Sequence, residues 1–316
     1  MLRSIFIGTG VIVLIIDQFI FPVSAATQYP AFFVGVLIVG IPHGAADLLV
    51  ASQKALLDKR FFSKVNFFSI YLSKLLLFGI ILWFLPVIGM ILFIVCAAYH
   101  FGETDLYEFK TSGFPGKLFV TSYGLTILGV LLFHRFDEVK PILEQFAGKT
   151  EYRQSLSWIE KHRYILLSFC ELFFVSSSFL YFLTNDRKKY PSGKFLIQYG
   201  LIIFIIYNLP LMAGFTFYFI LWHSVLSLTN ILSYLKKNNQ YSISFVYKQI
   251  AVYSLLAFIG IGILTFAGSL ILNVQSILLY VFVGLALLTA PHLSIMHEMY
   301  NDMRSMAANR NSVNEK

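Results

Sequence analysis

Four histidines lie inside long apolar stretches of the sequence: His43, His100, His223 and His292. Their local motifs are GIPHGAAD, YHFGETD, LWHS and APH, in that order. An ionisable ring in hydrocarbon needs a polar partner, so intramembrane ionisable residues are candidates for a functional site. Imidazole is a good ligand for iron, copper, zinc and nickel. Together the four histidines predict a buried transition-metal site, although each alone could equally be a hydrogen-bonded core residue.

Two carboxylates are spaced to support these histidines. Asp47 follows His43 by four residues and Glu103 follows His100 by three, so each acid shares a helix face with a histidine. A metal-bound histidine commonly donates its other ring N–H to a carboxylate, which fixes the orientation of the ring. We expect Asp47 and Glu103 to orient ligand imidazoles in this way, the alternative being that they mark helix ends at the membrane interface.

His297 competes with His292 for the role of fourth ligand. It follows His292 by five residues, which on an ideal helix is about 140° of rotation and about 7.5 Å of rise. The two rings cannot readily hold one ion without a helix break. We favour His292, because its depth matches the other three histidines and Pro291 could distort the helix there. His134 and His162 are expected to be ordinary interfacial or loop residues.

The segments that carry these residues are predicted to span a membrane. Hydrophobic residues make up 58% of the chain and charged residues only 13%, against about 25% in soluble domains, and the mean hydropathy is +0.74. We expect an all-α, polytopic transmembrane helical bundle with the metal site inside it. At about twenty residues per span, there are about ten spans: roughly 3–22, 30–52, 65–85, 87–108, 118–134, 164–183, 195–210, 212–235, 249–272 and 276–301.

Two proline steps, Leu85-Pro86 and Asn208-Leu209-Pro210, are expected to separate neighbouring spans. The seventh span, 195–210, is short. We expect one integral membrane domain over 1–301 and a polar cytoplasmic tail over 302–316. The 135–163 loop is expected to contain a short amphipathic helix at the interface.

The positions of the lysines and arginines predict the orientation. Most of the 24 fall in the N-terminus, 53–64, 109–117, 184–194, 236–248 and the C-terminal tail. Cytoplasmic loops are enriched in basic residues, so both termini are predicted to be cytoplasmic in a multi-pass protein of the cell inner (plasma) membrane. The net charge of +8 therefore reflects topology and contact with the lipid bilayer, and no nucleic-acid partner is expected.

The histidine motifs resemble those of a known family. P-H-G-A-x-D at 42–47, Y-H-F-G at 99–102, W-H-S at 222–224 and the late Pro291-His292 are similar, in this order, to motifs of the Brp/Blh family. These bacteriorhodopsin-related proteins act as β-carotene 15,15′-dioxygenases in bacteria and archaea. The family is membrane-embedded, is regarded as iron-dependent, and cleaves β-carotene at its central double bond to give two retinals.

The resemblance implies Fe(2+) as cofactor, β-carotene and O₂ as substrates, and a functional link to a retinal-binding rhodopsin. The histidines proposed as iron ligands in the family correspond to His43, His100 and His223. Some members have a second histidine one turn after the W-H-S histidine, but Ser227 stands at that position here. We therefore assign His292 as the fourth ligand.

Aromatic residues near the histidines suit such a substrate, because a carotenoid is an apolar rod that dissolves in the bilayer. We expect six of them to line a substrate tunnel, with helix or lipid packing as the alternative for each: Tyr99, Phe101, Tyr207, Phe215, Phe219 and Trp222.

Three other functions are alternatives to this interpretation. A membrane di-iron desaturase or hydroxylase would need H-x-x-x-H and H-x-x-H-H clusters, and the sequence has no H-x-x-H-H. A transporter of metals or small cations could use the same histidines but would show inverted repeats or paired broken helices. A non-catalytic carotenoid-binding membrane protein is the third. We expect a membrane-embedded non-haem iron dioxygenase that cleaves β-carotene with O₂ into two all-trans-retinal molecules, with no catalytic side chain beyond the metal centre.

Overall fold

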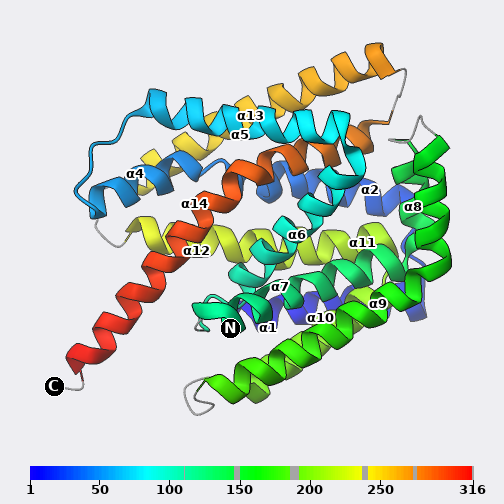
Figure 1. Cartoon of the computed structure of the whole chain (residues 1–316), viewed down its shortest axis with the longest axis horizontal. Coiled ribbons are helices and arrows are strands. Elements are labelled where there is room, and N and C mark those ends of the chain that lie inside the picture. The colour runs from blue at the N-terminus through cyan, green and yellow to red at the C-terminus, as the bar shows by residue number, and fades with distance from the viewer. Residues whose placement is uncertain (110, 146–149, 186–191, 237–240, 273–275, 315–316) are drawn as a thin grey trace. The chain divides into compact units, whose positions relative to one another are not determined.

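The computed structural model describes residues 1–109, 111–145, 150–185, 192–236, 241–272 and 276–314, and the regular structure in these residues is entirely helical (Figure 1). Nine of the described helical stretches are long and apolar enough to cross a membrane: 2–20, 25–57, 64–84, 86–105, 113–134, 153–184, 211–236, 243–270 and 277–306. A further apolar helix, 193–208, is shorter and coincides with the expected short seventh span. The predicted all-α, multi-span fold is therefore confirmed.

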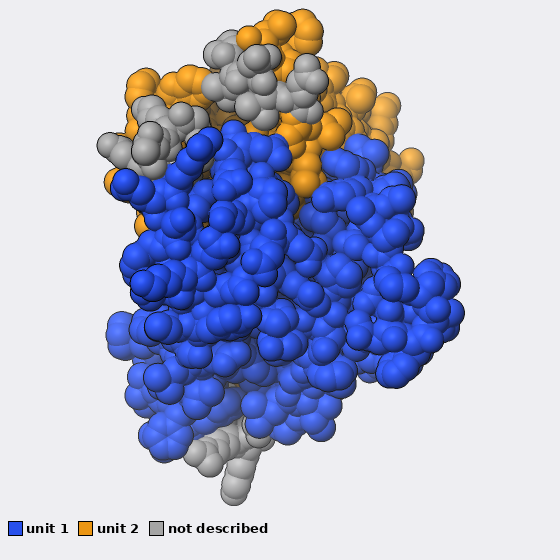
Figure 2. All heavy atoms as spheres, turned by 90° about the vertical axis from the view of Figure 1, so that its right-hand side faces the viewer, with its two compact units in different colours: residues 1–40, 111–226 blue, residues 41–110, 227–316 orange. Residues whose placement is uncertain are grey.

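The chain forms two compact units, each built from two separate stretches of sequence (Figure 2). Unit 1 comprises residues 1–40 and 111–226, and unit 2 comprises residues 41–110 and 227–316. The expected boundary between a membrane domain, 1–301, and a tail, 302–316, falls within one helix that runs on to Asn314.

Unit 1 combines α-helices with several π-helical segments. Its elements are α1 (Leu2–Ile15), η1 (Ile16–Ile20), α2 (Ala25–Gly35), η2 (Val36–Gly40), α7 (Gly113–Gly129), η3 (Val130–His134), α8 (Phe136–Glu144), α9 (Thr150–Thr184), α10 (Ser192–Asn208), α11 (Leu211–Phe215) and η5 (Thr216–Ser224). Aromatic stacking joins α7 to α9, where the rings of Phe119 and Tyr181 lie 4.5 Å apart and both side chains are fully buried.

The expected break at Pro210 separates α10 from α11, and the short helix expected in the 135–163 loop is α8. A helix end leaves backbone groups without helical partners, and side chains next to and within α8 satisfy them here. Arg135 donates to the carbonyl of Asn208 at 3.0 Å. The Glu138 carboxylate accepts the N–H of Leu211 at 3.0 Å. The break is therefore stabilised from outside the two helices that it separates.

Unit 2 is organised around its last helix. Its elements are α3 (Ile41–Gly44), α4 (Asp47–Leu57), α5 (Lys64–Phe84), α6 (Pro86–Asp105), α12 (Val225–Lys236), α13 (Ile243–Leu272) and α14 (Ile277–Asn314). Pro86 opens α6 directly after α5 ends, as expected. Helix α14 packs against α4, α5, α6 and α13 (Figure 1) and continues as one α-helix through Pro291. It therefore brings its own histidines against residues from several parts of the chain.

Candidate metal centre

His43 lies where the second apolar segment changes its helical geometry. The π-helical η2 ends at Gly40, α3 carries His43, and a turn at Ala45–Ala46 precedes α4, which begins at Asp47. Such π-helical interruptions are frequent at functional sites. The local fold therefore buries His43 and starts a new helix with a carboxylate close behind it.

Three histidine rings meet inside unit 2. The His292 ring on α14 lies edge-to-face with the His43 ring at 5.2 Å and with the His100 ring on α6 at 4.9 Å, between centroids. His43 and His100 offer ring nitrogens within 4.8 Å of each other. All three side chains are at most 6% exposed. Helices α3, α6 and α14 thus bring together three of the four histidines that the sequence singles out.

A carboxylate orients one of these rings. His292 Nδ1 lies 2.7 Å from Asp47 Oδ1, with both groups buried. In a neutral imidazole, an Nδ1 that donates to a carboxylate leaves the lone pair on Nε2. Among the described residues, His292 Nε2 has no hydrogen-bond partner. Tyr71 of α5 lies close to the Asp47 carboxylate. This is the arrangement of a metal-ligating histidine held by an acid behind it.

Glu103 occupies a second polar cluster one turn beyond His100. Its carboxylate is fully buried and accepts from His297 Nδ1 at 2.8 Å and from Arg304 Nη2 at 2.9 Å. The amide of Asn301 bonds the other ring nitrogen of His297 at 3.0 Å. Both nitrogens of His297 are therefore engaged by protein groups, in contrast to those of His292. The cluster ties α6 to α14 beside the three histidine rings.

Sequence reasoning missed Tyr71 and Arg304. Tyr71 is one of eighteen tyrosines, and its contact with Asp47 joins residues of two different helices. Arg304 lies in the segment expected to be a polar tail. A signal was available for Arg304, since it follows His297 by seven residues, about two helical turns, and so shares its helix face.

In unit 1, His223 is fully buried on the π-helical η5. The Phe219 ring stacks parallel to the His223 ring at 6.1 Å, and Phe215 stacks on Phe219 at 5.2 Å. Trp222 is buried against the edge of Phe6. Of the expected tunnel residues, Phe219 therefore stacks on His223, Phe215 stacks on Phe219, and Trp222 is the chain neighbour of His223.

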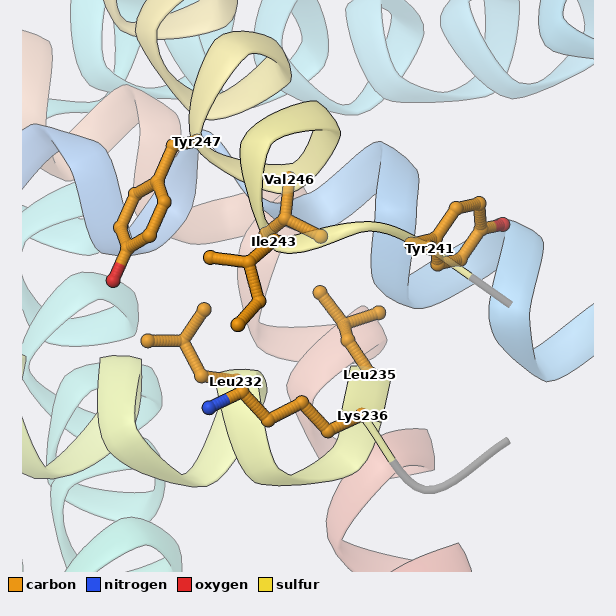
Figure 3. Close-up of a pocket in the computed structure, with 7 residues that line it drawn as sticks. All are labelled: Leu232, Leu235, Lys236, Tyr241, Ile243, Val246 and Tyr247. Atoms are coloured by element: carbon orange, nitrogen blue, oxygen red, sulfur yellow. The ribbon is translucent and has the colours of Figure 1, made fainter. Parts of the chain in front are cut away.

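The other expected tunnel residues have different surroundings. In unit 2, Phe101 is buried with its ring 6.3 Å from that of His100, and Tyr99 packs on His297. In unit 1, Tyr207 stacks on His134 at 3.6 Å and is 42% exposed. A small apolar hollow in unit 2 lies elsewhere, between the end of α12 and the start of α13, and none of these residues line it (Figure 3).

The donor set fits a first-row transition metal. Neutral imidazoles suit iron, copper and zinc, and one buried ring already presents a nitrogen with no protein partner among the described residues. The paired carboxylate on His292 also offsets part of the positive charge that such a metal would bring into a low-dielectric interior. The buried histidine rings can therefore form a metal centre.

Comparison with known proteins agrees with this chemistry. The family model described as beta-carotene 15,15′-dioxygenase matches residues 34–300, which include all four histidines. The beta-carotene 15,15′-dioxygenase of uncultured marine bacterium 66A03 is 27% identical over 270 residues, covering 83% of this chain and 90% of that protein. No solved structure matches the chain. The chain belongs to the beta-carotene 15,15′-dioxygenase family of membrane enzymes.

Proposed function

We propose that this protein uses Fe(2+) and O₂ to cleave β-carotene at its central 15,15′ double bond, giving two molecules of all-trans-retinal. The observation that carries the proposal is the convergence of buried histidines from α3, α6 and α14 within a chain of this family. The multi-span helical fold suits a substrate that is dissolved in the bilayer.

Four histidines would hold the iron in this proposal. His43, His100 and His223 are buried, carry the motifs of the family, and can each offer a ring nitrogen to a metal ion. His292 is favoured over His297 as the fourth, because its Nε2 has no partner among the described residues while both nitrogens of His297 are bonded. Bound Fe(2+) would supply the activation of O₂ that lets both oxygen atoms add across one C=C bond.

The protein's own groups would orient and shield this chemistry. Asp47 would hold His292 in the tautomer that leaves Nε2 as a lone-pair donor, and Tyr71 lies close to Asp47. Burial of the histidines excludes water, which strengthens electrostatic interactions in the site. We assign Glu103 the related task of holding α6 against α14, through His297 and Arg304.

Aromatic side chains would bind the substrate. Rings stack on a polyene without needing polar contacts, and placing one double bond at the metal is the main demand on the enzyme. We propose the tunnel lining expected from the sequence, and Phe219 and Phe101 are supported by their contacts with His223 and His100. We also propose that both termini are cytoplasmic, on the basis of the basic loops.

Expression in a bacterium that accumulates β-carotene tests the function. The wild type should bleach the orange colour and produce retinal, and the His100→Ala variant should do neither. His162→Ala is the matched control, since that histidine bonds a backbone carbonyl of its own helix, and it should bleach like the wild type. A wild type that is well expressed and loaded with iron, yet forms no apocarotenal, would refute the proposal and favour a binding or transport role.

A further inference from the structure

Helix α5 carries a lysine at its midpoint. Lys74 is ten residues from each end of α5 (Lys64–Phe84), which at about 1.5 Å per residue is about 15 Å from either end. That is the centre of a hydrocarbon core about 30 Å thick. Lys74 is exposed, and so are Ile70 and Leu77 on the same helix face. An ionisable group at this depth is costly and marks a candidate functional site.

A hydrogen-bonded chain holds the Lys74 amine at this depth. Lys74 Nζ donates to Ser294 Oγ on α14 at 2.6 Å, and Ser294 Oγ donates to the carbonyl of Pro291 at 2.9 Å. Ser294 follows His292 by two residues, about 3 Å along the helix. The amine therefore lies at the depth of the proposed iron site. It belongs to an exposed residue of α5, and α5 packs against α14.

The same helix also reaches the interior of the site. Tyr71, three residues before Lys74, lies close to the Asp47 carboxylate that orients His292. Helix α5 thus contacts the candidate metal centre through one side chain and offers an amine to the bilayer through another. A molecule that leaves the site between α5 and α14 would meet Lys74 at the membrane midplane.

The product that we propose has one polar group, an aldehyde at the end of an apolar chain. We propose that Lys74 is a product-binding residue, which captures the aldehyde of retinal at the surface of the protein by forming a reversible imine. This inference rests on the proposed function. In the reaction a C=N bond replaces the aldehyde C=O bond, and the carbonyl oxygen leaves as water with two hydrogens from the reacting amine.

The depth of Lys74 distinguishes this ligand from a phospholipid. Phosphate head groups lie at the interface, about 15 Å from the midpoint of α5, and the bond to Ser294 directs the amine towards α14 at the midplane. A carbonyl group attached to an apolar chain can reach that depth, because it carries no charge. The chemistry at Lys74 therefore matches an aldehyde better than an anionic lipid.

Borohydride trapping tests the proposal on full-length protein in lipid nanodiscs. All-trans-retinal is added to the His100→Ala variant, so that cleavage plays no part, and sodium borohydride reduces any imine to a stable secondary amine. Peptide mass spectrometry should find the adduct at Lys74 at least about tenfold above Lys64, the exposed lysine at the start of the same helix. A further Lys74→Arg substitution keeps a cation and a donor but forms no such adduct, so labelling in that peptide should disappear.

Two results would overturn the inference: equal labelling of Lys64 and Lys74, or no adduct on Lys74. Failure of the proposed function gives a different result, because the wild-type protein would then produce no retinal from β-carotene. Adduct formation at Lys74 is measured with added retinal and does not depend on that activity. Lys74→Arg keeps a positive charge at an exposed position, so we expect this variant to fold. The labelling of Lys74 itself is measured in protein that retains the lysine.

Discussion

Replacing Arg304 by methionine should destabilise unit 2 by about 3 kcal/mol. Glu103 has no exposed surface, and the Arg304 side chain that pairs with it at 2.9 Å is 19% exposed. Removing one partner of a buried ion pair costs about 3–5 kcal/mol, because a buried charge is left uncompensated. We expect the lower end of this energy range, because His297 still donates to the Glu103 carboxylate and the Arg304 side chain is partly accessible.

The Glu103→Gln/Arg304→Met double variant should be less destabilised than Arg304→Met alone. Glutamine removes the buried charge and keeps an oxygen that can accept from His297 Nδ1. The two substitutions should therefore be strongly non-additive, as expected for residues in one polar network. The free energies of unfolding of Arg304→Met, Glu103→Gln and the double variant are measured in mixed micelles by denaturant titration, so that the three values can be compared directly.

Arg163→Met is the matched control. Arg163 donates to Asp137 at 2.7 Å, but the Asp137 side chain is 71% exposed, and exposed ion pairs contribute about 0–1 kcal/mol. The control should therefore change the stability little. If Arg304→Met falls in the same range as Arg163→Met, or if the double variant equals the sum of the two single ones, the inference that this pair locks α6 to α14 is wrong.

Three further predictions concern the candidate centre and the helix break at Pro210. Single substitution by alanine of each proposed ligand should lower the iron content of the purified protein; the four positions are His43, His100, His223 and His292. Full iron occupancy in three or more of these variants would refute the ligand set. Asp47→Asn keeps the size of the side chain but removes the charge that holds His292, so iron affinity or turnover should fall about 10–100-fold; unchanged values would exclude the orienting role. Glu138→Gln weakens the acceptor for the Leu211 N–H and should cost roughly 1–2 kcal/mol of stability with wild-type iron content, while loss of iron would contradict its purely structural role.

The membrane-spanning character of the chain and the place of most of its helices could be predicted from the amino-acid sequence. A helix in lipid must be about twenty apolar residues long, and proline lacks the N–H that a helix interior needs. Hydropathy and the steps at Pro86 and Pro210 therefore predict elements that the structure contains. The histidine motifs were equally visible, because polar rings in apolar runs are conspicuous.

Which side chains contact one another could not be predicted from the sequence and depends on how the helices pack. Spacing placed Asp47 on the helix face of His43, but its bond to His292 joins residues 245 positions apart, and helix periodicity carries no information on which helix packs opposite. The bond between Glu103 and Arg304 was equally unpredictable, because Arg304 lies in the segment that was expected to be a polar tail. Residue spacing along the sequence specifies which side chains share a helix face, whereas packing between helices determines which residues that face contacts.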